Sequence, residues 1–144
     1  IELNALIEEV LADLEPLAQE NEVKLVEESE ELVMTGSDIL IYRMIYNLVE
    51  NAIKYNHVGG QVLVKAAQKD TDIVIEVEDT GNGISEEFRE RVFEPFFRVD
   101  KSRSRALGGV GLGLAMVREI VRVHDGKISI KENEYGGTTF EVVL

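Results

Sequence analysis

The feature that most constrains the fold is a stretch from Ser37 or Asp38 to about Tyr55 that combines an apolar stripe with a polar one. Ser37 or Asp38 can cap a helix here, because a short polar side chain accepts a hydrogen bond from the free N–H groups of a first turn. Apolar residues then recur at helical spacing, which predicts a long helix with one side on a core. They are Ile41, Ile45, Leu48 and Ala52.

Beside this stripe, the same helix carries Asn47, Asn51 and Lys54 at i, i+4 and i+7, followed by Tyr55. Residues at this spacing share one helix face. The amide oxygen of Asn51 suits Mg²⁺, which takes few protein ligands and completes its shell with phosphates and water. Lys54 can contact a phosphate and Tyr55 can stack on a base. Alternatively, the asparagines cap neighbouring loops and Lys54 is only solvated, and the helix alone leaves both interpretations open.

The remaining pattern predicts helices grouped against several mostly antiparallel strands. The other predicted helices cover residues 2–20, with Asn4 as the cap, about 86–92, and 112–123. The predicted strands are 23–26, 32–35, 61–67, 72–78, 127–131 and 138–144. This order indicates an α+β fold, a two-layer α/β sandwich whose helices pack on one face of a mixed, mostly antiparallel sheet.

Length and charge limit the possible partners. A chain of 144 residues fits one domain over residues 1–144. The net charge of −13 repels nucleic acid and anionic membrane surfaces, so we expect neither as a partner. A phosphate ligand can still bind where local cations, a metal ion and backbone N–H groups create a positive site. The lack of cysteine and of a long apolar run leads us to expect a cytoplasmic domain.

A second informative segment runs from Glu78 to Ile84 and places an acid at a strand end before a turn with two glycines. The Asp79 carboxylate can accept a hydrogen bond from an exocyclic amine. Gly81 and Gly83 allow positive φ and the close approach of a flat ligand. An ordinary Asp-Gly turn is the structural alternative for this segment.

A third segment, LGGVGLGL at residues 107–114, opens directly onto a predicted helix. Free N–H groups at a helix start favour phosphate. The segment is not a P-loop, because no Lys-Ser or Lys-Thr pair follows Gly113, and its glycine spacing differs from the G-x-G-x-x-G of dinucleotide sites.

Four segments in order resemble the N, G1, F and G2 boxes of the histidine kinase catalytic domain. They are NLVENAIKY at 47–55, DTGNGI at 79–84, FEPFFR at 93–98 and GVGLGL at 109–114, with GGTTF at 136–140 closing the resemblance. The resemblance implies the Bergerat fold of the ATPase superfamily that includes gyrase, the dimeric heat-shock chaperones and the mismatch-repair ATPases. ATP would then lie under a mobile lid at about residues 93–112.

The resemblance also implies roles, residue by residue. Asn51 resembles the magnesium ligand, Lys54 a phosphate contact, and Tyr55 the residue that stacks on adenine. Asp79 resembles the acceptor for the adenine amine, which Thr138 would join through water. The other positions expected to contact the nucleotide are Asn47, Gly81, Gly83, Ile84, Lys101, Gly109, Gly111, Leu112 and Gly113.

Basic residues follow the phenylalanines of the F box. Arg98, Lys101, Arg103 and Arg105 supply local positive charge that the chain as a whole lacks, and one of them can stabilise a transferring γ-phosphoryl group. We take Arg98 and Arg103 as the catalytic candidates. Before them, Phe93, Phe96 and Phe97 form either an exposed cluster for a partner or the lid, or an ordinary part of the core.

The residue at position 47 helps to distinguish ATP hydrolysis from phosphoryl transfer. Hydrolases of the superfamily resemble one another in having a glutamate one turn before the magnesium asparagine, as the base for water, whereas this chain has Asn47. An amide cannot take a proton from water at neutral pH, so transfer to an external acceptor fits better than fast hydrolysis.

The resemblance implies that the acceptor is a histidine on an upstream dimerisation hairpin, which we expect to be absent from this chain. For His57 and His124 we expect surface or capping roles instead. The expected partners are that hairpin and a response regulator, with the isolated domain a monomer cut from a sensor kinase. The alternatives are a degenerate nucleotide-binding switch and a serine kinase of the anti-sigma-factor type.

Overall fold

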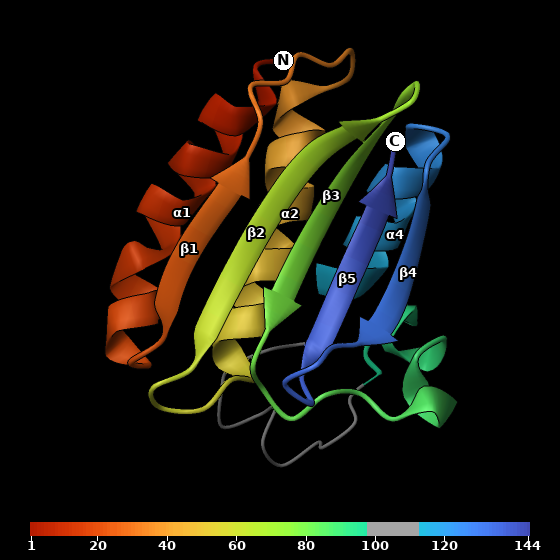
Figure 1. The fold of residues 1–144 in the computed structure, drawn as a ribbon. Helices are drawn as coiled ribbons and strands as arrows, with labels where there is room; N and C mark the ends of the chain where they lie inside the picture. Colours follow the sequence, from red (N-terminus) through yellow and green to blue (C-terminus); the bar gives the residue numbers. More distant parts are fainter. Residues whose placement is uncertain (98–112) are drawn as a thin grey trace.

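The computed structural model describes residues 1–97 and 113–144, which form a mixed sheet with helices on one face (Figure 1). The strands are β1 (Lys24–Ser29), β2 (Gln61–Lys69), β3 (Asp72–Asp79), β4 (Lys127–Glu132) and β5 (Thr138–Val143). The α-helices are α1 (Leu3–Glu20), α2 (Asp38–Lys54) and α4 (Gly113–Val123). Two short 3₁₀ helices, η1 (Glu86–Phe88) and η2 (Arg91–Phe93), follow β3.

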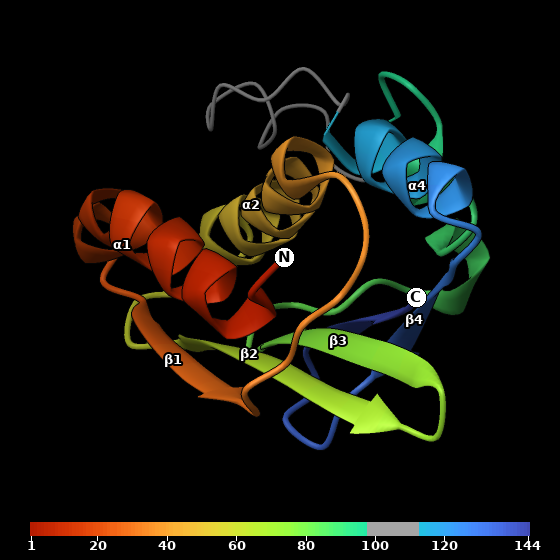
Figure 2. The same cartoon turned by 90° about the horizontal axis from the view of Figure 1, so that it is seen from above.

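The strands are ordered β1-β2-β3-β5-β4 in one sheet. β1 pairs with β2 in parallel, and the other neighbours pair antiparallel. A parallel pair needs a crossover connection, and here α2 supplies it by running between β1 and β2. Helices α1, α2 and α4 cover the same face (Figure 2). The predicted two-layer α+β sandwich is therefore confirmed, as an open sheet.

The core lies between the helices and the sheet, and the predicted stripe of α2 faces it. Ile41, Ile45 and Leu48 are fully buried there. The sheet contributes alternate residues from each strand, such as Val62 and Val64 of β2, because side chains alternate between the faces of a sheet. Burying each large aliphatic side chain contributes about 1.5–3 kcal/mol, so this stripe firmly fixes the position of α2.

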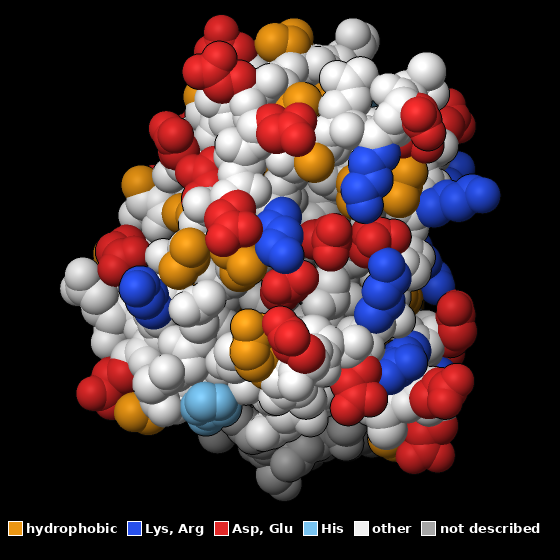
Figure 3. Space-filling model, in the orientation of Figure 1, with side chains coloured by type: hydrophobic (Ala, Val, Ile, Leu, Met, Phe, Trp, Pro, Cys, Tyr) orange, Lys and Arg blue, Asp and Glu red, His pale blue; other side chains and the backbone are white. Residues whose placement is uncertain are grey.

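None of the described helices lies on the opposite face of the sheet, which presents interspersed acidic and basic side chains (Figure 3). Lys65 pairs with Glu78 at 3.3 Å, and Lys131 pairs with Glu141 at 2.8 Å. Glu76 lies directly opposite Glu141 in the register of β3 and β5, which places like charges together. This face is a solvated surface, and the polar stripe of α2 lies on the other side of the sheet.

The start of α1 differs from the prediction. Glu2 occupies the N-cap position without a side-chain cap bond, so the expectation that Asn4 caps the helix is wrong. The first turn is anchored by tertiary pairing instead, because the Leu3 N–H donates to the Leu32 carbonyl at 2.9 Å. An orphan N–H group at a helix start can be satisfied in this way without a capping side chain.

Two other predicted elements are also wrong. Residues 32–35 form no strand: their only ladder contact is an isolated bridge between Val33 and Glu2. Their apolar character reflects Leu32, which packs into the core. The helix predicted at 86–92 is replaced by η1 and η2. In the described ranges, no helix is long and apolar enough to cross a membrane.

Candidate functional site

The polar row of α2 begins from a well-capped helix. The Ser37 hydroxyl accepts a hydrogen bond from the Leu40 N–H at 3.2 Å, which confirms the predicted cap. Asn47, Asn51 and Lys54 are half-buried along α2, whose C-cap is Tyr55. The helix therefore runs towards the end of the sheet at which β3 stops and β5 begins (Figure 1).

The first residue of this row contacts the start of α4. The Asn47 amide nitrogen lies 3.6 Å from the Met116 sulfur, and a Cβ built on Gly113 would lie 3.8 Å from the Asn47 Cγ. Because α4 packs beside α2 (Figure 2), the last glycine of the predicted glycine-rich loop is adjacent to the polar row. The N-terminal end of α4 and the α2 row thus border the same region.

Within the described residues, Lys54 makes a loose ion pair in its own helix. Its Nζ lies 3.7 Å from the Glu50 carboxylate, and both side chains are partly exposed. Exposed pairs of this kind contribute about 0–1 kcal/mol, so Lys54 can readily turn to another anion. The Asn51 amide makes no hydrogen bond within residues 1–97 and 113–144, and it is likewise available for a ligand.

Asp79 is the best-defined ionisable group of the site. Its side chain lies at the end of β3 and is buried, with 8% of the residue exposed. The Oδ1 atom accepts hydrogen bonds from the Gly81 N–H at 2.9 Å and the Thr138 N–H at 3.2 Å. Burial raises the pKa of this carboxyl, while those two N–H groups act in the opposite direction. A buried acid held by backbone donors is suited to a specific polar contact.

The two glycines after Asp79 serve different purposes. Gly83 has φ of +74°, a conformation that L side chains rarely adopt. Gly81 does not have positive φ, so that part of the prediction is wrong for it. Gly81 is required instead by close packing, because an added Cβ would lie 2.6 Å from the Tyr55 carbonyl oxygen.

A hydrogen-bond network that the sequence did not reveal joins the end of α2 to the same turn. The buried Asn56 donates to the Gln61 carbonyl at 3.0 Å and accepts from the Thr80 hydroxyl at 3.1 Å. The Thr80 hydroxyl accepts from the Gln61 N–H at 2.9 Å. This network fixes the position of Tyr55 relative to Asp79. Thr80 belongs to the DTGNGI segment at 79–84, and its place in that segment was the signal in the sequence that could have revealed its role.

A second residue missed by sequence reasoning is Asn133, the first residue after β4. Its Nδ2 donates to the Asp79 carbonyl at 2.8 Å, and its Oδ1 accepts from the N–H groups of Tyr135 and Gly137 at 3.1 and 3.0 Å. Asparagine commonly hydrogen-bonds the backbone two residues on, and this turn preference was the only signal in the sequence.

The phenylalanines of the F box divide between the two predicted roles. Phe93 is buried and packs edge-on against Phe140 at 6.3 Å between ring centroids. Phe97 packs against Phe88 at 5.9 Å. Phe96 is 67% exposed and has φ of +65°. Phe93 therefore belongs to the core, and only Phe96 presents its ring to solvent.

The histidines have the surface and capping roles that were expected. His124 follows α4, where its Nδ1 lies 2.8 Å from the Ile120 carbonyl oxygen and its Nε2 accepts from the Ser37 N–H at 3.2 Å. It therefore joins the end of α4 to the start of α2. His57 is exposed and contacts the Val58 carbonyl at 3.1 Å.

Several predicted site residues lie outside the described residues. They are Arg98, Lys101, Arg103, Gly109, Gly111 and Leu112, together with most of the expected lid. Of the remainder, Ile84 is half-buried against the core and Thr138 is buried beside Asp79. Among residues 1–97 and 113–144, no group of three or more His, Cys, Asp or Glu side chains is placed to hold a metal ion.

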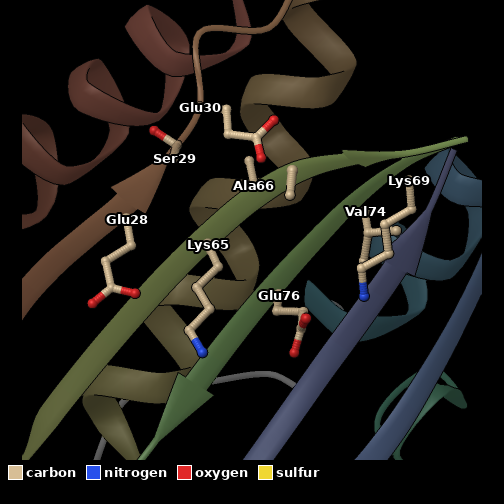
Figure 4. A pocket seen from close by; sticks show the side chains of 9 residues that line it. Glu28, Ser29, Glu30, Lys65, Ala66, Lys69, Val74 and Glu76 are labelled. Carbon is tan, nitrogen blue, oxygen red and sulfur yellow. The ribbon is translucent and has the colours of Figure 1, made fainter.

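A hollow of about 370 Å³ lies elsewhere, on the helix-free face of the sheet (Figure 4). Glu28 of β1, Lys65 of β2 and Glu76 of β3 line it with other residues of these strands. It is open and mixed in charge, and the sheet separates it from the α2 row. The candidate site is therefore the region at the end of the sheet that Asp79, the α2 row and the start of α4 build.

Comparison with known proteins identifies this arrangement. The family described as histidine kinase-, DNA gyrase B- and HSP90-like ATPase matches residues 36–144. The sensor-like histidine kinase SenX3 of Mycobacterium tuberculosis is 44% identical over 113 residues, covering 78% of this chain and 28% of SenX3. The chain thus corresponds to a minor part of that relative.

Similar solved structures are also histidine kinases. The nucleotide-free catalytic domain of the histidine kinase ThkA matches with a TM-score of 0.88 and 28% identity, covering 100% of this chain and 92% of that one. ThkA in complex with the response regulator protein TrrA matches with a TM-score of 0.84 and 28% identity, covering 100% and 40%. Full-length ShkA in complex with AMPPNP matches with a TM-score of 0.84 and 25% identity, covering 99% and 30%.

The family match extends over most of the sequence, and the sheet and helices have the arrangement of the ThkA catalytic domain. This chain therefore belongs to the histidine kinase-, DNA gyrase B- and HSP90-like ATPase family, as a catalytic ATP-binding domain of the histidine kinase type.

Proposed function

We propose that this domain binds MgATP and donates the γ-phosphoryl group to a histidine on the dimerisation hairpin of a sensor histidine kinase. The observation that carries the proposal is the buried Asp79 carboxylate at the end of β3. Its Oδ1 is held by two backbone N–H groups, and the exocyclic amine of adenine is the donor that such an acid would select. The AMPPNP bound by full-length ShkA, an ATP analogue, supports the same ligand class.

The α2 row supports binding of the phosphates. Asn51 is the magnesium ligand in this proposal, and Lys54, one turn on, contacts a phosphate. A single amide oxygen fits Mg²⁺, which usually keeps several waters and takes its other ligands from phosphates. Bound there, Mg²⁺ would neutralise phosphate charge as the phosphoryl group is transferred. Gly113, the first described residue of α4, lies beside Asn47, and N–H groups of a helix start there would be suited to a phosphate.

The residues near the phosphate end favour transfer over hydrolysis. Asn47 stands where the hydrolases of the superfamily place a glutamate, and an amide is no base for water. Glu50 precedes Asn51 by one residue and so points about 100° around the helix from it, which makes Glu50 no ready substitute. We propose Arg98 or Arg103 as the cation that stabilises the transferring group, with Lys101, Gly109, Gly111 and Leu112 as further nucleotide contacts.

The partners follow from this chemistry. The domain would act on a helical hairpin of the same kinase, which would then pass the phosphoryl group to a response regulator. ThkA, a similar protein, has been solved in complex with a response regulator. We propose a cytoplasmic location and a monomeric isolated domain, because the dimer contacts would lie in the hairpin.

Phosphoryl transfer to a supplied acceptor tests the proposal. The chain is incubated with γ-labelled ATP, Mg²⁺ and the separately expressed hairpin of its parent kinase, and labelled hairpin is quantified after alkali and after acid. We expect label that survives alkali and is lost in acid, as phosphohistidine requires. Replacing the hairpin histidine with glutamine is the matched control and should abolish labelling.

Two results would contradict the proposal in different ways. Label that survives acid would indicate a hydroxyl acceptor and hence a serine kinase. Tight ATP binding without any labelling of the hairpin would indicate a nucleotide-binding switch. Calorimetric titration with ATP and GTP, each with and without Mg²⁺, establishes binding independently of transfer.

A further inference from the structure

The Asn133 side chain ties the turn between β4 and β5 to the end of β3. The Asn133 Nδ2 donates to the Asp79 carbonyl at 2.8 Å and lies 3.3 Å from the Thr138 carbonyl oxygen. The Oδ1 atom of the same amide accepts from Tyr135 and Gly137 inside the turn. One amide therefore both shapes the turn and fixes it to the strand that carries Asp79.

Close packing makes the position of Asp79 depend on this turn. A Cβ built on Gly137 would lie 2.0 Å from the Asp79 carbonyl oxygen, so the two backbones are in direct contact. The next residue, Thr138, donates its N–H to Asp79 Oδ1 at 3.2 Å. A displacement of the turn would therefore move one of the two donors that orient the carboxylate. The other donor, Gly81, follows Asp79 two residues on in the chain, so its hydrogen bond is local to the end of β3.

We propose that Asn133 is a positioning residue that determines adenine selectivity by orienting the Asp79 carboxylate through the β4–β5 turn. The inference rests on the proposed function for the identity of the ligand. Asn133 itself contacts the backbone and not the base. Its effect is therefore expected only on ligand groups that Asp79 contacts, and not on the phosphates that α2 would bind.

The residue type fits this role. The amide offers a donor to Asp79 and an acceptor to the turn at the same time. Asn133→Asp keeps the acceptor for the N–H groups of Tyr135 and Gly137 but loses the donor to the Asp79 carbonyl. Asn133→Ala loses both. The two variants thus separate attachment of the turn to β3 from formation of the turn.

The test compares two nucleotides by titration calorimetry at constant Mg²⁺. One is ATP, and the other is purine riboside 5′-triphosphate, which lacks only the exocyclic amine. We expect Asn133→Ala to lower the affinity for ATP about tenfold, as loss of one well-placed hydrogen bond does, and the affinity for the analogue less than about twofold. In an Asp79→Asn background, Asn133→Ala should then have little further effect on ATP affinity.

Asn21→Ala is the matched control. The Asn21 amide also donates to a backbone carbonyl at 2.8 Å, but it does so at the end of α1, away from the site. Its replacement should leave both affinities unchanged. If circular dichroism shows that Asn133→Ala is unfolded, Asn133→Asp takes its place, with the same expected difference between the two nucleotides.

Equal losses for ATP and the analogue, or effects of Asn133 and Asp79 that simply add, would overturn the inference and reduce Asn133 to a structural residue. If the unmodified chain binds neither nucleotide, the proposed function itself fails. A chain that binds ATP but loses both affinities equally in Asn133→Ala retains the proposed function and loses only this inference.

Discussion

The two ends of the candidate site are built in opposite ways. Around Asp79, nearly every contact involves backbone: N–H groups hold the carboxylate, and Gly137 packs directly on its peptide. Along α2, the contacts to described residues are a long one from Asn47 to a sulfur and a loose ion pair of Lys54. The Asp79 end is therefore pre-organised, whereas the α2 end carries side chains that can still rearrange.

This difference matches the demands of the proposed ligand. A base presents the same flat edge each time it binds, so a rigid acceptor loses little entropy on binding. Phosphates change charge and position during transfer, and flexible side chains can follow them. The comparison predicts that a substitution that disturbs the packed backbone at the Asp79 end lowers stability, while side-chain substitutions on α2 affect binding alone.

The largest effect should come from Gly137→Ala. The added methyl group would overlap the Asp79 carbonyl oxygen, which is part of the backbone and cannot swing aside as the end of a flexible side chain could. We expect the free energy of unfolding to fall by about 3 kcal/mol or more, measured by urea denaturation. Gly136→Ala is the neighbouring control. Gly136 has φ of +77° but nothing within 4 Å of an added Cβ, so its cost should be only about 1–2 kcal/mol.

Equal destabilisation by the two glycine variants would contradict this account. It would mean that backbone conformation, and not contact with Asp79, governs the turn. The rigid end of the site would then be an ordinary glycine turn without close packing on β3.

Asp79→Asn should separate binding from stability at the rigid end. The amide can still accept from the Gly81 and Thr138 N–H groups, but the charge that attracts the adenine amine is lost. We expect ATP affinity to fall by about 2 kcal/mol, roughly thirtyfold, by calorimetry. The fold should be retained, because the side chain keeps its shape.

The pH dependence of stability gives Asp79→Asn a second readout. Burial raises the pKa of Asp79 in the folded state above its ordinary value of 3.8, so the folded state holds this proton more tightly than the unfolded chain does. Stability is therefore lost as pH rises from that ordinary value through the raised one. The neutral asparagine avoids this loss, and its stability relative to the unmodified chain should be greater at neutral pH than near pH 4 in urea titrations. A difference that is independent of pH would contradict the burial argument.

Much of the fold could be predicted from local pattern. The α2 stripe and the β2–β3 hairpin around Asp70 were correctly predicted, because their periodicity reflects which side faces the core. The strand at 32–35 was wrong because a short apolar run can equally serve one buried residue, here Leu32. The cap of α1 was wrong because pairing between Leu3 and Leu32 replaces a capping side chain.

The sequence predicts the residues of the candidate site that are expected to face the ligand. It does not predict the residues that only hold other residues in place. Asp79 and the α2 row lie in recognisable segments, and Gly113, the last glycine of the glycine-rich segment, lies beside Asn47. Asn56 and Asn133 each bond to a residue far away in sequence, Asn56 to the Thr80 hydroxyl and Asn133 to the Asp79 carbonyl. Their partners are set by the register of β3 with β2 and β5, which no local pattern encodes.

The smallest of these effects should come from the flexible end, with Asn51→Ala. The Asn51 amide makes no hydrogen bond to other residues in the described parts of the chain, so we expect the free energy of unfolding to change by less than about 0.5 kcal/mol. ATP affinity in Mg²⁺ should fall about tenfold and become equal to the affinity without Mg²⁺, because one metal ligand is lost. Asn4→Ala on α1 is the control and should leave the magnesium response intact. A variant that loses stability as Gly137→Ala does would show that both ends are rigid, whereas a normal response to magnesium would remove Asn51 from the metal site and leave only Asp79 as a defined contact.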